Sequence, residues 1–319
     1  MPTVEIKMNP HRVTPKVDLA FKKIFGVEEN KDLLISLINS IVSEKDQIAD
    51  LTLLNPYNPQ NFPNDKLSIL DIKAKGTDGH LFNVEIQLAD ESNYENRALY
   101  YWGKVYTEQL KSGQNYSKLK KTIGIHILNF VTVPESQEYH NIFHIVEQKK
   151  GFKFFHNFEI HTIELTKFSH DMEEDLNDLL KRIKSSIDMW MAFLTRNDLL
   201  DQSSLPETLS DENLKKALNV LDVINFSEEE RDLYEGRLKW IRMEESAMLK
   251  KFEDGLKQGI EQGITQGIEQ GITQGIEQGI THGIENTALN MLKQNLEIDI
   301  ISSVTGLPIE KIHLLKKQL

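Results

Sequence analysis

The sequence LSILDIKAKGTDGHLFNVEIQL, residues 67–88, contains two runs of alternating apolar and polar residues separated by GTDGH. Alternate residues of an extended chain lie on one face, and glycine and aspartate between the runs favour a tight turn. The stretch therefore predicts an antiparallel β-hairpin with one apolar face. That face is formed by Leu70, Ile72 and Ala74 on the first strand and Phe82, Val84, Ile86 and Leu88 on the second.

The opposite face of the predicted hairpin carries two acidic residues. A five-residue turn at 76–80 pairs Lys75 with Leu81 and so places Asp71 opposite Glu85. Directly opposed Cβ atoms lie about 4.5–5.5 Å apart, and two carboxylates this close repel each other unless a cation lies between them. Such oxygen ligands suit Mg²⁺ or Mn²⁺, which makes the pair a candidate metal site. The alternative is a solvent-facing hairpin that is merely acidic.

Several motifs together resemble a known family. DLAFKKIF at 18–25, LDIKAKGTDGHLFNVEIQ at 70–87, and Arg97 and Tyr101 in a predicted helix resemble the PD-(D/E)XK nuclease family transposases, a group of recombination-promoting nucleases. The resemblance covers about residues 14–200. It implies an α/β fold with a restriction-endonuclease-like core, in which helices flank a mixed central sheet, here followed by a C-terminal helical extension.

The resemblance implies a metal-dependent DNA endonuclease that hydrolyses phosphodiester bonds. Asp71 and Glu85 would bind Mg²⁺ (or Mn²⁺), and Gln87, which replaces the usual motif lysine, would orient the attacking water or the scissile phosphate. Asp18 is either a further metal ligand or only the N-cap of its helix. A role in recombination, in transposition or in defence against foreign DNA remains open. The candidate phosphate-binding residues are Arg97, Lys73, Lys104 and Tyr101.

A competing hypothesis belongs to another class of function. The chain could be a catalytically silent DNA-binding or oligomeric assembly protein, with a residual acidic hairpin. A degenerate nuclease is expected to lose one acidic residue, whereas Asp71 and Glu85 are both present. The sequence therefore favours the enzyme.

Composition limits the remaining possibilities. The 319 residues include no cysteine, which excludes disulfides and thiolate chemistry, and no run reaches the 18 or so apolar residues of a membrane span. We expect a cytoplasmic protein without a membrane partner. The net charge of −12 lies mostly in the second half: residues 1–160 hold 19 Lys/Arg and 20 Asp/Glu, whereas residues 161–319 hold 18 and 29. The charge of the predicted nuclease part thus permits DNA binding.

We expect five segments along the chain. These are a flexible leader (1–14), the nuclease-like domain (15–200), a helical region (201–254), a tandem-repeat helix or linker (255–285) and a C-terminal helical hairpin (286–319). Hydrophobic periodicity predicts helices at 18–25, 32–42, 94–112, 172–195 and 211–223, and another from about 227 into the repeats. It predicts further strands at 121–130, 141–148 and 152–165, with His126 as a packed core residue.

The repeats place a glycine at every fourth residue from Gly255 to Gly283, in the unit QGIEQGIT. Each interior glycine destabilises a helix by about 1 kcal/mol relative to alanine, so this helix needs a partner close to its glycine groove. We expect a homo-oligomer formed through this helix, with a fraying linker as the alternative. The tail at 296–319 has the outline of a helix-turn-helix, but it lacks a basic face and fits a packed helical hairpin better.

Overall fold

The computed structural model describes residues 13–55, 71–89, 93–169 and 174–319. Most of the predicted leader, the proline-rich segment at 56–65 and the start of the hairpin at 67–70 lie outside the described residues. The chain divides into two compact units, Met1–Glu244 and Glu245–Leu319. The boundaries of the five predicted segments remain a prediction.

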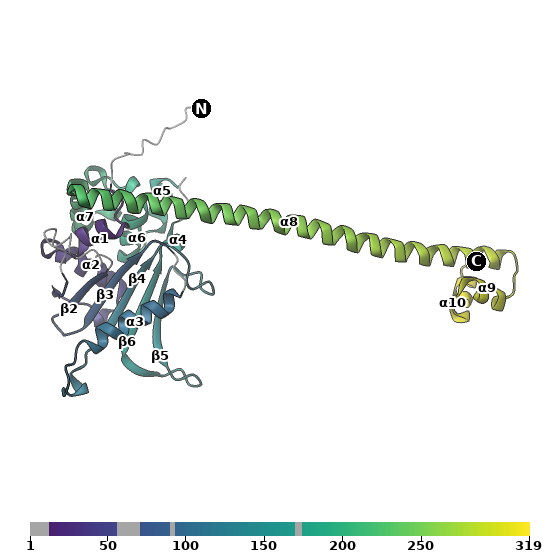
Figure 1. Ribbon diagram of the computed structural model, residues 1–319, viewed down its shortest axis with the longest axis horizontal. Coiled ribbons are helices and arrows are strands. Elements are labelled where there is room, and N and C mark those ends of the chain that lie inside the picture. Colours follow the sequence, from purple (N-terminus) through teal and green to yellow (C-terminus); the bar gives the residue numbers. More distant parts are fainter. Residues whose placement is uncertain (1–12, 56–70, 90–92, 170–173) are drawn as a thin grey trace, which may run out of the picture. The chain divides into compact units, whose positions relative to one another are not determined.

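A mixed sheet forms the centre of the first unit (Figure 1). Within the described residues its strand order is β1-β2-β3-β4-β6-β5. β4 pairs in parallel with β3 and β6, and the other neighbours are antiparallel. The predicted strands are confirmed, whereas the short β1 was not predicted. The strands are β1 (Leu51–Leu53), β2 (Asp71–Gly76), β3 (Leu81–Gln87), β4 (Thr122–Leu128), β5 (His140–Val146) and β6 (Lys153–Glu164).

The predicted hairpin is formed by β2 and β3. Lys75 pairs with Leu81 and Asp71 pairs with Glu85, which is the register that a five-residue turn imposes. Gly79 takes a left-handed conformation in this turn, with φ of 92°, and the Asp78 carboxylate accepts a hydrogen bond from the backbone N–H of His80 at 3.0 Å. The turn chemistry alone therefore predicted which residues face each other.

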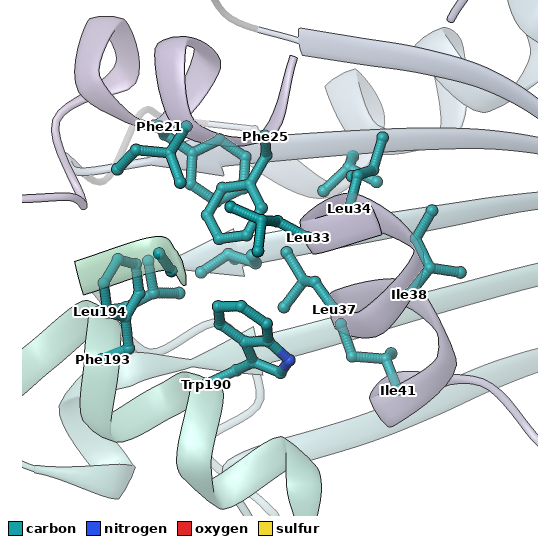
Figure 2. Packing of buried hydrophobic residues seen from close by; sticks show 14 of the residues in the cluster. Phe21, Phe25, Leu33, Leu34, Leu37, Ile38, Ile41, Trp190, Phe193 and Leu194 are labelled. Carbon is teal, nitrogen blue, oxygen red and sulfur yellow. The ribbon is translucent and has the colours of Figure 1, made fainter. Parts of the chain in front are cut away.

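One face of the sheet packs against an apolar helical layer, formed by α1 (Asp18–Phe25), α2 (Lys31–Ile41), α6 (Ser186–Arg196) and α7 (Glu212–Val223). Figure 2 shows aromatic rings from α1 and α6 meeting the leucines and isoleucines of α2. The rings of Phe25 and Trp190 pack edge to face with centroids 5.4 Å apart. Burial of this layer, at about 25 cal/mol per Å² of apolar surface, holds the sheet and the helices together.

Three helix predictions need correction. Asp18 is the first residue of α1 and not its N-cap, because Val17 is the last residue with extended backbone angles. The helix expected at 172–195 is two helices, α5 (Leu176–Arg182) and α6, since Ile183 is extended and Ser185 caps α6 through the N–H of Asp188. A short α4 (Leu165–Phe168) follows β6.

The third correction concerns α3, which was expected to continue to residue 112 but spans Tyr94–Thr107. The Thr107 hydroxyl donates to the carbonyls of Gly103 and Lys104, and the following loop contains Gly113 with φ of 81°. A hydroxyl that bonds back to the preceding turn weakens the helix, and a left-handed residue does not continue it.

α3 lies across the other face of the sheet (Figure 1). Trp102 anchors it by donating its indole N–H to the carbonyl of Thr122 at 2.8 Å. Tyr101 is only half-buried, because its neighbour Trp102 takes the position that faces the sheet. The buried residues of α3 are Tyr94, Ala98, Trp102 and Val105.

The C-terminal unit contains the repeats and the tail. α8 (Glu228–Lys293) begins in the first unit, where Tyr234 and Ile241 pack with residues of α1, and its repeat portion lies in the second unit. α9 (Ile298–Thr305) and α10 (Ile309–Lys316) pack against the end of α8 through a small apolar cluster that includes Leu292 and Ile301. Among the described residues, no helix has the length and apolarity needed to cross a membrane.

An ionic network supports the β5–β6 hairpin. The Glu159 carboxylate is buried and accepts from Lys121 at 2.9 Å and from His161 at 3.0 Å. Lys121 also contacts Asp46 at 2.8 Å, and the imidazoles of His140 and His161 are stacked with a nitrogen-to-nitrogen distance of 2.8 Å. Burial alone would raise the pKa of Glu159, but His161 and Lys121 outweigh it and bring the pKa to about 2.

This network predicts a loss of stability in mild acid. Burial, with a smaller contribution from His161, lowers the pKa of His140 from 6.5 to about 4. The unfolded chain therefore binds more protons than the fold between pH 6.5 and 4, and the free energy of unfolding falls as pH falls through this window. Urea unfolding between pH 7 and 4.5 measures the slope.

In His140→Gln we expect a shallower pH dependence than in the wild type over this range. His156→Gln is the matched control, because His156 is exposed on the same hairpin. Equal slopes for wild type and His140→Gln would contradict the prediction.

Candidate active site

The polar face of β3 lies beneath α3. Asn83, Glu85 and Gln87 alternate along the strand, and each is at most 2% exposed. The idea of a solvent-facing acidic hairpin is therefore wrong for Glu85, because α3 covers this face. A buried carboxylate is strongly unfavourable unless it is paired and hydrogen-bonded, so its partners show what the site is built to hold.

Glu85 divides its two oxygens between different neighbours. Arg97 on α3 donates from Nη2 to Oε1 at 2.8 Å. The guanidinium of Arg97 lies 5.5 Å from the centroid of the Tyr101 ring, a cation–π arrangement. Two residues predicted to bind phosphate, Arg97 and Tyr101, are thus assembled around the predicted metal ligand.

The second oxygen of Glu85 faces a histidine from the next strand. His126 Nδ1 lies 3.6 Å from Glu85 Oε2 and 2.7 Å from the Tyr94 hydroxyl. Among the described residues, Glu85 Oε2 has no hydrogen-bond partner, and neither has the buried Oδ1 of Asn83 or Nε2 of His126. The site therefore contains a buried carboxylate oxygen that no hydrogen bond from the described residues satisfies.

Sequence reasoning placed His126 in the core but missed its place beside Glu85. The residue is fully buried, as predicted. The parallel register of β3 and β4 pairs Glu85 with His126, and no turn joins these two strands to fix that register in the sequence. Tyr94 and Asn83 were also missed: Tyr94 lies outside the quoted motifs, and Asn83, inside the motif at 70–87, was given no role.

Asp71 and Lys73 lie on β2, on the same side of the hairpin as Glu85 according to strand parity. The backbone of Asp71 pairs with Glu85, and that of Lys73 pairs with Asn83. The side chain of Asp71 is outside the described part of the structure. The register nevertheless places the two acidic positions directly opposite each other.

Three of the predicted site residues remain to be placed: Gln87, Lys104 and Asp18. The Gln87 side-chain amide is buried and donates to the carbonyl of Ala89 at 3.4 Å, while Lys104 is exposed on α3. Asp18 has an ion pair with Arg237 of α8 at 3.3 Å. Burial raises the pKa of Asp18, partly offset by Arg237. The carboxylate of Asp18 is thus already engaged by a cation.

The residues present fit a hard divalent cation. Mg²⁺ commonly uses one or two carboxylates and completes its coordination with water and substrate phosphate. Glu85 offers one open oxygen, and the register brings Asp71 opposite it. Among the side chains that the structure describes, no group of three His, Asp or Glu residues is arranged to hold a metal ion.

Comparison with known proteins adds to this geometry. A family model described as PD-(D/E)XK nuclease family transposase matches residues 15–250. The chain belongs to this family. Searches of curated proteins and of solved structures found no match. The mixed sheet flanked by helices agrees with the restriction-endonuclease-like fold of PD-(D/E)XK enzymes, and membership indicates a nuclease with DNA as its substrate.

The family match also covers more of the chain than the motifs indicated. It continues past residue 200 through α7 and into α8. This agrees with the packing, because Leu214 and Leu218 of α7 are buried in the main core. α7 and the first part of α8 therefore lie within the region that matches the family.

Removing Arg97 should destabilise the fold. Arg97→Ala leaves the buried Glu85 carboxylate without its cation, and we expect the free energy of unfolding at pH 7 to fall by about 3 kcal/mol. Glu85→Gln in the same chain should restore much of this loss, since it removes the uncompensated charge. Urea unfolding of the two single variants and the double variant gives the coupling between them.

Lys104→Ala is the control on the same helix, because Lys104 is exposed. A loss of stability in Arg97→Ala no larger than that in Lys104→Ala would contradict the prediction that Arg97 compensates the buried Glu85 carboxylate.

Proposed function

We propose that this PD-(D/E)XK protein is a metal-dependent DNA endonuclease of the recombination-promoting nuclease type. The supporting observation is the β2–β3 register, which sets Asp71 opposite Glu85. One oxygen of Glu85 is buried and without a hydrogen-bond partner among the described residues. Membership of the family indicates that the substrate is DNA.

Asp71 and Glu85 would hold Mg²⁺ or Mn²⁺, which on binding would lower the pKa of a water molecule and stabilise the charge that develops on the phosphate. Gln87, two residues along the same face of β3, would orient the attacking water or the scissile phosphate through its amide. Asp18 is the weaker candidate for a third ligand, because its carboxylate contacts Arg237.

Arg97 would pair with Glu85 before metal binds and with a DNA phosphate afterwards. Without metal its guanidinium neutralises Glu85 at 2.8 Å. When a cation neutralises Glu85, the guanidinium becomes available to clamp a phosphate with its forked donors, while Tyr101 limits the orientations of its plane. Lys73 and Lys104 would contribute further phosphate contacts.

His126 and Tyr94 would act as positioning residues for Glu85. The imidazole lies between the Tyr94 hydroxyl at 2.7 Å and Glu85 Oε2 at 3.6 Å. Neighbours that orient a ligating carboxylate tune its affinity for metal. Both side chains are buried between α3 and the sheet, which would exclude water from the rear of the site.

The test is nicking of supercoiled plasmid by wild type, Asp71→Asn and Glu85→Gln in Mg²⁺, in Mn²⁺ and in chelator. We expect wild-type nicking that requires metal and a loss of at least about 100-fold in both variants, because each removes a charged metal ligand. Asp78→Asn is the matched control, since Asp78 lies at the turn of the same hairpin, and it should cleave like wild type.

Inactive wild-type protein in both metals, or equal activity in all four proteins, would contradict the enzyme proposal. In that case the non-catalytic DNA-binding or assembly function would be the better explanation.

We also propose that two or more copies associate through the repeat helix. In the described structure nothing lies within 4 Å of the positions where side chains would start at Gly255 to Gly283. The isoleucines at 260, 264, 268, 272, 276 and 280 are each 54–58% exposed. A four-residue apolar period corresponds to the i±4 ridges that interdigitate at a crossing angle near −50°. Glycines on such ridges allow close approach.

Replacing Ile264, Ile268 and Ile272 with glutamine should convert the oligomer to monomer without reducing helix propensity, since glutamine is a good helix former. Analytical ultracentrifugation at micromolar concentration measures the mass. Leucine at the same three positions is the control and should preserve association. A monomeric wild-type protein would contradict this proposal.

A further inference from the structure

A second polar feature lies at the other end of the hairpin from Asp71. A pocket of about 450 Å³ is lined by four lysines, and we call it the lysine pocket: Lys73 and Lys75 of β2, with Lys118 and Lys120 of the segment that follows α3. Glu108 is the acidic residue in its lining, and Leu81 and Val105 contribute apolar surface. Of the two segments that supply these lysines, only β2 lies within the family motifs.

Local structure fixes the lysines in place. Parity along β2 puts Lys73 and Lys75 on the same face as Asp71. The stem of Lys120 crosses Gly79, where an added Cβ would lie 3.3 Å from its Cγ. The Gln109 side chain holds the backbone of Lys120 with hydrogen bonds of 2.8 and 3.1 Å. The lysines are thus presented by a folded surface and not by a free loop.

The charge of this region contrasts with that of the chain. Residues 97–121 contain six Lys/Arg and one Glu, although the whole protein has a net charge of −12. Within the described residues, no ion pair joins a carboxylate to Lys75, Lys118 or Lys120, whereas Lys121 is paired with Asp46 and Glu159. Like charges held around one pocket repel each other, and a polyanion relieves that repulsion.

The spacing relates the lysine pocket to the proposed active site. Asp71 and Lys75 are four residues apart on one strand, or about 13 Å at 3.3 Å per residue. Phosphates of one DNA strand rise by about 3.4 Å per nucleotide along the helix axis and also wind around it, so a separation of this size spans only a few nucleotides. A phosphate backbone bound at the lysine pocket could therefore belong to the same strand that reaches Asp71 and Glu85.

We propose that the lysine pocket binds the phosphodiester backbone of DNA a few nucleotides from the scissile bond. The proposal rests on the proposed nuclease function and adds to it the residues Lys75, Lys118 and Lys120. The contacts are to phosphates and carry no base specificity. The pocket therefore contributes affinity and alignment of the strand.

The test measures DNA binding without cleavage. Fluorescence anisotropy with a labelled DNA duplex in chelator, from 50 to 300 mM salt, compares wild type with the Lys75→Gln/Lys118→Gln/Lys120→Gln variant. Each lost phosphate contact reduces the slope of log K against log salt by about 0.9. We expect the slope to fall by about two to three and Kd at low salt to rise by at least about tenfold. All three positions are exposed, so the variant should fold normally.

The matched control is Lys149→Gln/Lys150→Gln/Lys184→Gln, which removes the same charge from exposed positions elsewhere. The proposal is overturned if the lysine-pocket variant retains the wild-type slope and Kd, if the control loses as much, or if the wild type does not bind DNA. An RNA duplex bound more tightly than DNA would overturn the assignment to DNA.

The two proposals can fail separately. Loss of binding in the lysine-pocket variant together with an inactive wild type in the nicking assay supports the pocket and contradicts the nuclease. Metal-dependent nicking together with unchanged binding contradicts the pocket alone.

Discussion

A carboxylate beneath a helix is the constraint on which the site depends. Glu85 is 2% exposed between β2 and β4, and an isolated charge there would be strongly unfavourable. The fold meets this requirement with Arg97 from α3, while Tyr94 and His126 line the other side of the carboxylate. The placement of Arg97 on the buried side of α3 meets the requirement of this one side chain.

The two faces of the sheet have different functions because they are covered differently. Four helices bury one face in a continuous apolar core, which supplies most of the stability. The other face is covered by α3, which carries polar groups inward as well as apolar ones. The second face can therefore keep buried polar atoms without hydrogen-bond partners among the described residues, because the first face stabilises the whole unit.

The C-terminal unit differs from the first unit in how its helices pack. Its apolar cluster involves only the end of α8 with α9 and α10. The repeat helix contains eight glycines at four-residue spacing, which amounts to about 8 kcal/mol of lost helix propensity. In the described structure no contact lies within 4 Å of the positions where side chains would start at these glycines, so contacts within one chain do not offset this loss there.

The sequence by itself determined the hairpin and its register, since glycine and aspartate in a five-residue turn and strict alternation leave one pairing that buries the apolar face. It also determined the strands β4, β5 and β6 and most helices, because their periodicity is local. Tertiary structure alone decided that α3 covers Glu85, that Arg97 neutralises it, and that His126 and the lysines at 118 and 120 come close to the hairpin. These contacts join segments far apart in the chain, and they depend on parallel strand pairing and on helix packing, neither of which leaves a periodic signal in the sequence.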